Sequence, residues 1–154
     1  MHSNTQKINR SGFQPSGVAF WQRLAPWVWA ARPRVLPACL SPVLISSLLA
    51  YQTPSFSWAV AFYCALFALM AQVFANYSND YYDFLKGTDK PETRLGPQRA
   101  LASGWITLGQ MRWAMGIVAV LAAFSGLGLL AYGGWGLVPL GAVCLLAAWA
   151  YTAG

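Results

Sequence analysis

Four oxygen-bearing side chains gather at the end of a long apolar stretch. The stretch 58–83 begins with uniformly apolar residues, and Asn76, Asn79, Asp80 and Asp83 then follow at spacings i, i+3, i+4 and i+7. At about 100° per residue the four fall inside an arc of about 100°, so a helix would carry them as one polar stripe. Two carboxylates and two amides on one face could bind a cation or a polar ligand.

Two acidic groups one turn apart repel each other and lose hydration in a partly apolar site, so we expect a positive partner. One candidate is the basic loop that follows, with Lys86, Lys90, Arg94 and Arg99. Arg side chains match phosphate oxygens bidentately. The other candidate is Mg²⁺, which is typically held by one or two carboxylates together with substrate phosphates. A metal and a basic loop together would make a diphosphate site.

A purely structural reading of the stripe is that Asn and Asp solvate or cap the last turn of the helix. The helix dipole disfavours acidic residues at a C-terminus, so this reading explains Asn79 better than Asp80 and Asp83. Acids at a membrane edge are functional candidates by default. The only histidine, His2, lies in a polar tail, which removes His-based acid–base or metal chemistry from consideration.

Three tyrosines interleave with the stripe and are typical of residues that sit at the membrane interface. They are Tyr77, Tyr81 and Tyr82.

The composition places the stripe in a membrane protein. Of the 154 residues, 57% are hydrophobic and 9% are charged, whereas a soluble domain carries about 25% charged residues. In a soluble chain the net charge of +6 would raise the question of nucleic acid. Here the position of each charge matters more, and we expect a membrane-lipid environment and no nucleic-acid partner.

Four stretches have spanning length at about 20 residues per crossing, which predicts an all-α bundle of four transmembrane helices. They are 35–51, 58–83, 111–132 and 135–152.

Residues 1–17 form a polar tail, and 18–31 are short and rich in Trp, which is typical of a helix lying along the headgroups. The expected organisation is a cytoplasmic tail with an interfacial helix over 1–34 and a transmembrane domain over 35–154.

The basic residues predict the orientation. All ten lie before the first stretch or between the second and the start of the third. By the positive-inside rule the N-terminus and the long link face the cytoplasm, so we expect a multi-pass plasma (inner) membrane protein. Since the 26 residues of 58–83 would make a helix about 40 Å long against a hydrocarbon core of about 30 Å, the carboxylates would reach headgroup depth.

The stripe and its loop carry a family resemblance. The run Asn79-Asp80-Tyr81-Tyr82-Asp83, then Lys86-Gly87-Thr88-Asp89 and residues 94–107, resemble the first Asp-rich motif and following loop of the UbiA-type intramembrane prenyltransferases. Residues 29–38 are similar to the family's entry into its first helix.

The position of the third acid indicates a branch of this family. Gly87 stands where the general pattern has that acid, and Asp89, two residues on, fills the place used in the branch acting on 1,4-dihydroxy-2-naphthoate in menaquinone biosynthesis. Val35 stands where this branch often has Thr.

The resemblance implies Mg²⁺-dependent transfer of a polyprenyl group from polyprenyl diphosphate to dihydroxynaphthoate, with loss of CO₂, to give demethylmenaquinone. Asp80 and Asp83 would be the catalytic metal ligands, with Asp89 as a further group of the metal site. The residues implied in diphosphate binding are Asn76, Asn79, Lys86, Arg94, Arg99 and Arg32. Arg32 is equally well read as a topology anchor or as a group for the aromatic carboxylate.

The family has eight or nine helices and a second Asp-rich motif on a later helix, whereas nothing after Thr107 here contains an acid. We therefore expect this chain to be the front half of a longer bundle, inactive without the C-terminal half. Two alternatives stay open. One is another aromatic prenyltransferase, acting on homogentisate or haem. The other is a non-catalytic four-span protein or transporter half, although transporter sites usually lie near the bilayer midplane.

Overall fold

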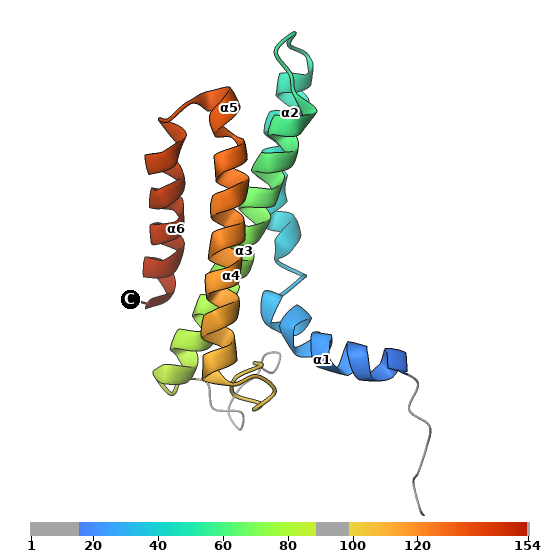
Figure 1. Ribbon diagram of the computed structural model, residues 1–154, viewed down its shortest axis with the longest axis vertical. Coiled ribbons are helices and arrows are strands. Elements are labelled where there is room, and N and C mark those ends of the chain that lie inside the picture. Colours follow the sequence, from blue (N-terminus) through green and yellow to red (C-terminus); the bar gives the residue numbers. More distant parts are fainter. Residues whose placement is uncertain (1–15, 89–98, 154) are drawn as a thin grey trace, which may run out of the picture.

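The computed structural model describes residues 16–88 and 99–153, and all regular structure within these ranges is helical. The helices are α1 (Ser16–Ala31), α2 (Leu36–Tyr51), α3 (Trp58–Leu85), α4 (Leu108–Gly128), α5 (Leu130–Gly133) and α6 (Leu137–Ala153). Helices α2, α3, α4 and α6 run up and down beside one another, and α1 projects sideways from the bundle (Figure 1). The all-α fold is confirmed.

Local signals set the helix ends close to the predicted ones. Helix α4 begins before the predicted Met111 because Thr107 forms a capping box with Gln110. The Gln110 amide donates to Thr107 Oγ1 at 3.3 Å and the Thr107 amide donates to Gln110 Oε1 at 2.9 Å, which satisfies two donors that the helix leaves unpaired.

By length and composition, fewer helices qualify as membrane crossings than the four that the sequence predicts. Helix α3 and the continuous pair α4–α5 (Leu108–Gly133) are long and apolar enough to cross. A third crossing arises if α1 and α2, bent by 63° relative to each other, count as one broken span. Helix α6 is apolar but shorter. Among the described helices, two or three meet the length and composition expected of a crossing, so the predicted number of four is not confirmed.

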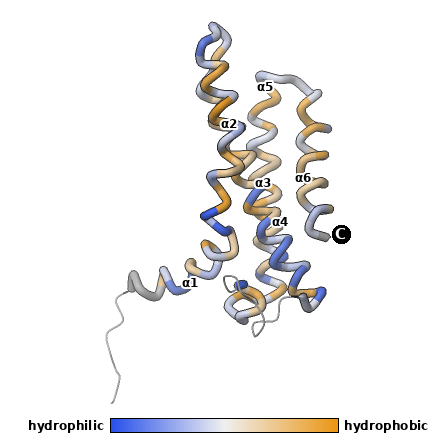
Figure 2. The backbone as a smooth tube through the Cα atoms, turned by 180° about the vertical axis from the view of Figure 1, so that it is seen from behind, coloured by the Kyte–Doolittle hydropathy of each residue, from blue (hydrophilic) through white to orange (hydrophobic). Residues whose placement is uncertain are grey.

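The polar and apolar surfaces are arranged for a membrane. Outward-facing positions are apolar, such as Leu48 on α2, Ile117 on α4 and Val143 on α6. Buried side chains on α3, in contrast, include Asn76 and Asp80. Hydrophilic segments gather around the α1–α2 bend and the lower end of α3, apart from the link at the far tip of α2 (Figure 2). The polar groups thus cluster at one end of the bundle.

A small apolar core surrounds this end and fixes the elements there. It joins α1, α3, the segment after residue 99 and the start of α4, through Ala30, Tyr77, Leu101, Ile106 and Met111. The rings of Trp27 and Tyr77 meet edge to face with centroids 6.0 Å apart. The core holds the polar stripe of α3 against the bend between α1 and α2.

Candidate functional site

The stripe on α3 faces inward, toward the α1–α2 bend and the segment that begins at Arg99. Asn76 and Asp80 are buried, and Asn79 and Asp83 are half-buried. The predicted helical spacing is therefore realised with all four polar groups turned away from the lipid-facing surface.

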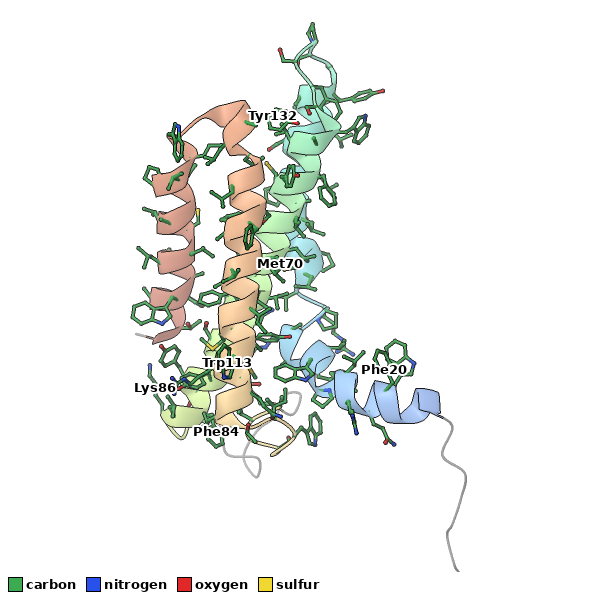
Figure 3. The ribbon with its side chains drawn as sticks, in the orientation of Figure 1. Phe20, Met70, Phe84, Lys86, Trp113 and Tyr132 are labelled. Atoms are coloured by element: carbon green, nitrogen blue, oxygen red, sulfur yellow. The ribbon has the colours of Figure 1, made fainter. Side chains whose placement is uncertain are left out.

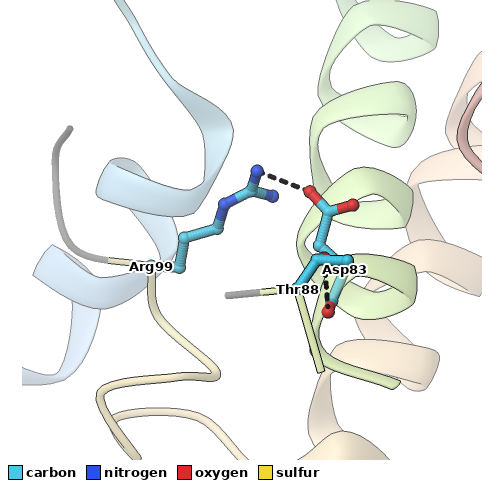
Figure 4. Close-up of polar contacts among 3 residues, drawn as sticks. All are labelled: Asp83, Thr88 and Arg99. Carbon is cyan, nitrogen blue, oxygen red and sulfur yellow. Dashed lines mark hydrogen bonds and ion pairs between the residues drawn. The ribbon is translucent and has the colours of Figure 1, made fainter. Parts of the chain in front are cut away.

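Asp83 is paired with an arginine from the connection between α3 and α4. Arg99 Nη2 lies 2.5 Å from Asp83 Oδ2, and the Arg99 side chain is only 11% exposed (Figure 4). The Thr88 hydroxyl donates to the backbone carbonyl of Asp83 at 3.1 Å and closes the end of α3. Because solvent screens a mostly buried pair weakly, the Coulomb attraction between the two charges is stronger than in a surface ion pair, although burial also costs both groups hydration.

Asp80 lies deeper, at 2% exposure. Burial disfavours its charge, and the guanidinium groups of Arg99 and Arg32 and the backbone amides of Ala100 and Leu101 offset part of this cost. Its Oδ1 atom is buried and accepts no hydrogen bond from the part of the chain that the structure describes. A buried carboxylate oxygen without a hydrogen bond costs free energy unless a ligand or a metal ion contacts it. Asp80 Oδ1 is therefore a candidate ligand atom.

Arg32 joins the site from the bend, where its φ is +53°. The left-handed conformation costs a non-glycine residue about 1–2 kcal/mol. With its amide oxygen turned to Arg32, Asn79 accepts from Nη1 at 3.3 Å and from Nη2 at 3.2 Å, and its amide nitrogen donates to Asp83 Oδ2 at 3.3 Å. Asn79 therefore links the arginine of the bend to the acid at the end of α3.

The donor set fits Mg²⁺ that is shared with an anionic ligand. Asp80 and Asp83 supply carboxylate oxygens, and Mg²⁺ is usually bound by one or two such groups plus waters and phosphates. Among residues 16–88 and 99–153 no group of three His, Cys, Asp or Glu could hold a metal by itself. Arg32 and Arg99 would repel a bare cation, whereas a diphosphate would bring negative charge for both the metal and the guanidinium groups.

The remaining predicted residues fall into two groups. Lys86 is exposed and directly follows the last residue of α3. Figure 3 shows it at the same end of the helix as Phe84, with Tyr132 at the opposite end of the bundle. Asp89 and Arg94 lie outside the described residues.

Asn76, also predicted to bind diphosphate, has both ends of its amide on protein groups. It donates to the Ala31 carbonyl at 2.7 Å and accepts from Gln72 Nε2 at 3.3 Å.

Sequence reasoning missed several contacts of the site. The backbone amides of Ala100 and Leu101 carry no side-chain signal. Tyr77, expected at the membrane interface, is only 7% exposed and donates to the Trp27 carbonyl at 3.2 Å. The one available signal was the tyrosines among the stripe residues, since Tyr77 directly follows Asn76 in the sequence.

Comparisons with known proteins place the chain in a family. The family described as the UbiA prenyltransferase family matches residues 39–154. The 1,4-dihydroxy-2-naphthoate octaprenyltransferase of Escherichia coli is 35% identical over 86% of this chain and 44% of its own length, and the protein of that name from Mycobacterium tuberculosis is 35% identical over 84% and 44%.

A more distant relative is the UbiA prenyltransferase domain-containing protein 1 homolog of Drosophila melanogaster, 32% identical over 76% of this chain and 32% of its own. No solved structure matches the chain. The chain spans less than half the length of the curated relatives it matches. On the family match, which covers most of its residues, the chain belongs to the UbiA prenyltransferase family.

Proposed function

We propose that this chain forms the diphosphate-binding part of a membrane-embedded enzyme that transfers a polyprenyl group from polyprenyl diphosphate to 1,4-dihydroxy-2-naphthoate. The observation that carries the proposal is the buried Asp80, with an oxygen that accepts no hydrogen bond from the described residues, beside Asp83 and between two arginines. The names of the relatives support an octaprenyl donor and a dihydroxynaphthoate acceptor.

The residues of the site would act on the leaving group. Arg32 and Arg99 would stabilise the negative charge that develops on the diphosphate as the allylic C–O bond breaks and its electron pair leaves with the oxygen. Bound Mg²⁺ would neutralise further charge on the phosphate oxygens. Asp80 and Asp83 would hold that ion, with Asp89 as a further group, and Asn79 would orient the diphosphate.

Lys86 and Arg94 complete the proposed basic lining. The acceptor ring carbon that bears the carboxylate would attack the prenyl carbon, and the carboxylate would leave as CO₂ to give demethylmenaquinone. The decarboxylation rests on the resemblance to the naphthoate branch, and the names of the relatives support the acceptor.

We also propose that α2, α3, α4 with α5, and α6 make four crossings in the inner membrane. The N-terminus and residues 86–107 would face the cytoplasm, where nine of the ten basic residues would then lie, with Arg112 near the start of α4. Helix α1 would lie along the headgroups, since Phe20 and Trp21 are 58% and 66% exposed. The rest of the enzyme would pack against the apolar faces of this half and supply a second acidic motif.

The test is prenyl transfer by the complete reading frame that contains this chain, purified in lipid nanodiscs. Octaprenyl diphosphate and Mg²⁺ would be offered with dihydroxynaphthoate or with homogentisate, and the prenylated product measured by mass spectrometry. We expect the naphthoate product, with loss of CO₂. Transfer to homogentisate alone would refute the acceptor, and no transfer to either would refute the enzyme assignment.

Asp83→Asn tests the metal role within this assay. The variant keeps the shape of the side chain but removes the charge, so we expect turnover to fall about 100-fold or more while membrane insertion is unchanged. Ser78→Ala is the control because Ser78 is buried on the same helix, α3, and is not among the proposed site residues. Undiminished turnover in Asp83→Asn would exclude the metal role.

A further inference from the structure

The bend between α1 and α2 is held by hydrogen bonds from α3. Asn76 Nδ2 donates to the carbonyl of Ala31, the last residue of α1, at 2.7 Å. Carbonyls in the last turn of a helix have no partner within that helix, so Asn76 caps α1 from a residue 45 positions away in sequence. One residue further along α3, the Tyr77 hydroxyl donates to the Trp27 carbonyl at 3.2 Å.

The residue that follows the capped carbonyl is Arg32. Its φ of +53° lies in the left-handed region, which a non-glycine side chain keeps only when its surroundings enforce it. Two backbone hydrogen bonds stabilise the bend itself. The Arg32 amide donates to the Trp29 carbonyl at 3.1 Å, and the Val35 amide donates to the Arg32 carbonyl at 2.9 Å. This conformation directs the Arg32 guanidinium group to Asn79 and toward Asp80.

The Asn76 amide uses one N–H for Ala31 and one lone pair for Gln72, and its burial shields the rest of the amide from a ligand. Its Oδ1 atom accepts from Gln72 Nε2 at 3.3 Å, and the residue is 5% exposed. The Ala31 carbonyl can only accept, so it fixes the nitrogen end of the Asn76 amide toward it, and the oxygen on the other side then makes Gln72 Nε2 the donor.

We infer that Asn76 is a positioning residue that acts through Arg32. It holds the α1–α2 bend so that Arg32 stays left-handed and its guanidinium group faces the diphosphate, and it does not bind the diphosphate itself. This inference rests on the proposed function for its effect on substrate, while the hold on the bend can be measured without any substrate.

The first arm of the test is hydrogen exchange of the full-length protein in nanodiscs, followed by mass spectrometry of peptides over residues 29–36. Asn76→Ala and the near-isosteric Asn76→Leu remove the bond to Ala31. Both are expected to speed exchange there about tenfold, with peptides of α4 unchanged. Ser78→Ala is the matched control and leaves the bend unaltered. Tyr77→Phe keeps the ring and should give a smaller rise. Unchanged exchange in both Asn76 variants overturns the inference.

The second arm measures binding of inorganic pyrophosphate with Mg²⁺ to the same proteins. Asn76→Ala and Arg32→Gln should each weaken binding about tenfold, and the double variant should be no weaker than Arg32→Gln alone. Multiplied losses in the double variant would mean that Asn76 acts independently of Arg32 and would overturn the inference. In the transfer assay Asn76→Ala should raise KM for polyprenyl diphosphate more than it lowers kcat.

The two hypotheses fail in different ways. A wild-type protein that neither binds magnesium pyrophosphate nor transfers a prenyl group would refute the proposed function, and the exchange arm would still decide whether Asn76 holds the bend. A wild-type protein that does both, with exchange over 29–36 indifferent to Asn76, would refute the inference alone.

Discussion

Asp80 and Asp83 stand one turn apart on α3 in different surroundings. Asp80 is 2% exposed and faces two guanidinium groups and two backbone amides. Asp83 is half-buried and pairs directly with Arg99. Because Arg99 contacts one acid and stabilises the other, it is the residue on which both carboxylates depend. Binding of a magnesium diphosphate would require Arg99 to share its donors with the phosphate oxygens.

A substitution series at Arg99 follows from this position. Arg99→Gln removes the charge and should raise KM for polyprenyl diphosphate about 10–100-fold, because a charge-assisted hydrogen bond contributes about 1.5–3 kcal/mol. Arg99→Lys keeps the charge but loses the planar fork of the guanidinium group, so its KM should lie between those of the wild type and Arg99→Gln. The measurement is steady-state transfer in nanodiscs. Arg112→Gln, an exposed position on α4, is the control, and an equal KM in Arg99→Gln and wild type would contradict the phosphate role.

Close contact between α3 and α4 depends on glycine at one position. A Cβ added at Gly128 would lie 2.6 Å from the Tyr63 ring, whereas at Gly116, on the same helix, it would meet nothing within 4 Å. The end of α4 can thus approach the start of α3 only without a side chain at Gly128. Small residues serve this purpose widely in membrane helix pairs.

Gly128→Ala should therefore destabilise the protein by about 1–3 kcal/mol through overpacking against Tyr63. The measurement is the Tm of the detergent-solubilised protein. Gly116→Ala should leave Tm unchanged or raise it, since Ala favours a helix over Gly by up to about 1 kcal/mol. A Tm of Gly128→Ala equal to that of Gly116→Ala would show that the Tyr63 ring moves aside without cost.

At the scale of the whole molecule, the polar site lies at one end, and the helices are largely apolar along the rest of their length apart from the link at the far tip of α2 (Figure 2). The buried ion pair and the bend belong to the same end as Lys86 (Figure 3). This separation suits the proposed substrate, polyprenyl diphosphate. The charged diphosphate must meet charged groups, and the polyprenyl tail must stay in the hydrocarbon of the membrane.

The proposed orientation can be tested by labelling single cysteines in intact inner-membrane vesicles. Cys39, Cys64 and Cys144 are free and would first be changed to Ala. A cysteine at Ser55, in the exposed link between α2 and α3, should react with an impermeant maleimide only from the periplasmic side. One at the exposed Lys86 should react only from the cytoplasmic side. Labelling of both from one side would refute an α3 that crosses the membrane.

The sequence by itself determined the helices and one face of the site. Apolar runs separated by neutral or basic links specify the helices, because whether a segment forms a helix depends mainly on residues near one another in the chain. The spacing of Asn76, Asn79, Asp80 and Asp83 specifies their common face for the same reason, since helix geometry is local. The number of crossings was less certain, because α2 and α6, at 16 and 17 residues, lie at the short limit of about 17 residues for a span.

Only the tertiary structure decided what faces that stripe. Arg32 and Asp80 come together because the chain bends by 63° between α1 and α2, and the bend depends on a side chain 45 residues from the carbonyl it binds. The role of Asn76 changed for this reason: spacing groups it with the ligand residues, whereas packing gives it a backbone partner. Contacts between distant segments depend on how helices pack, and residue spacing within one helix carries no information about its neighbour.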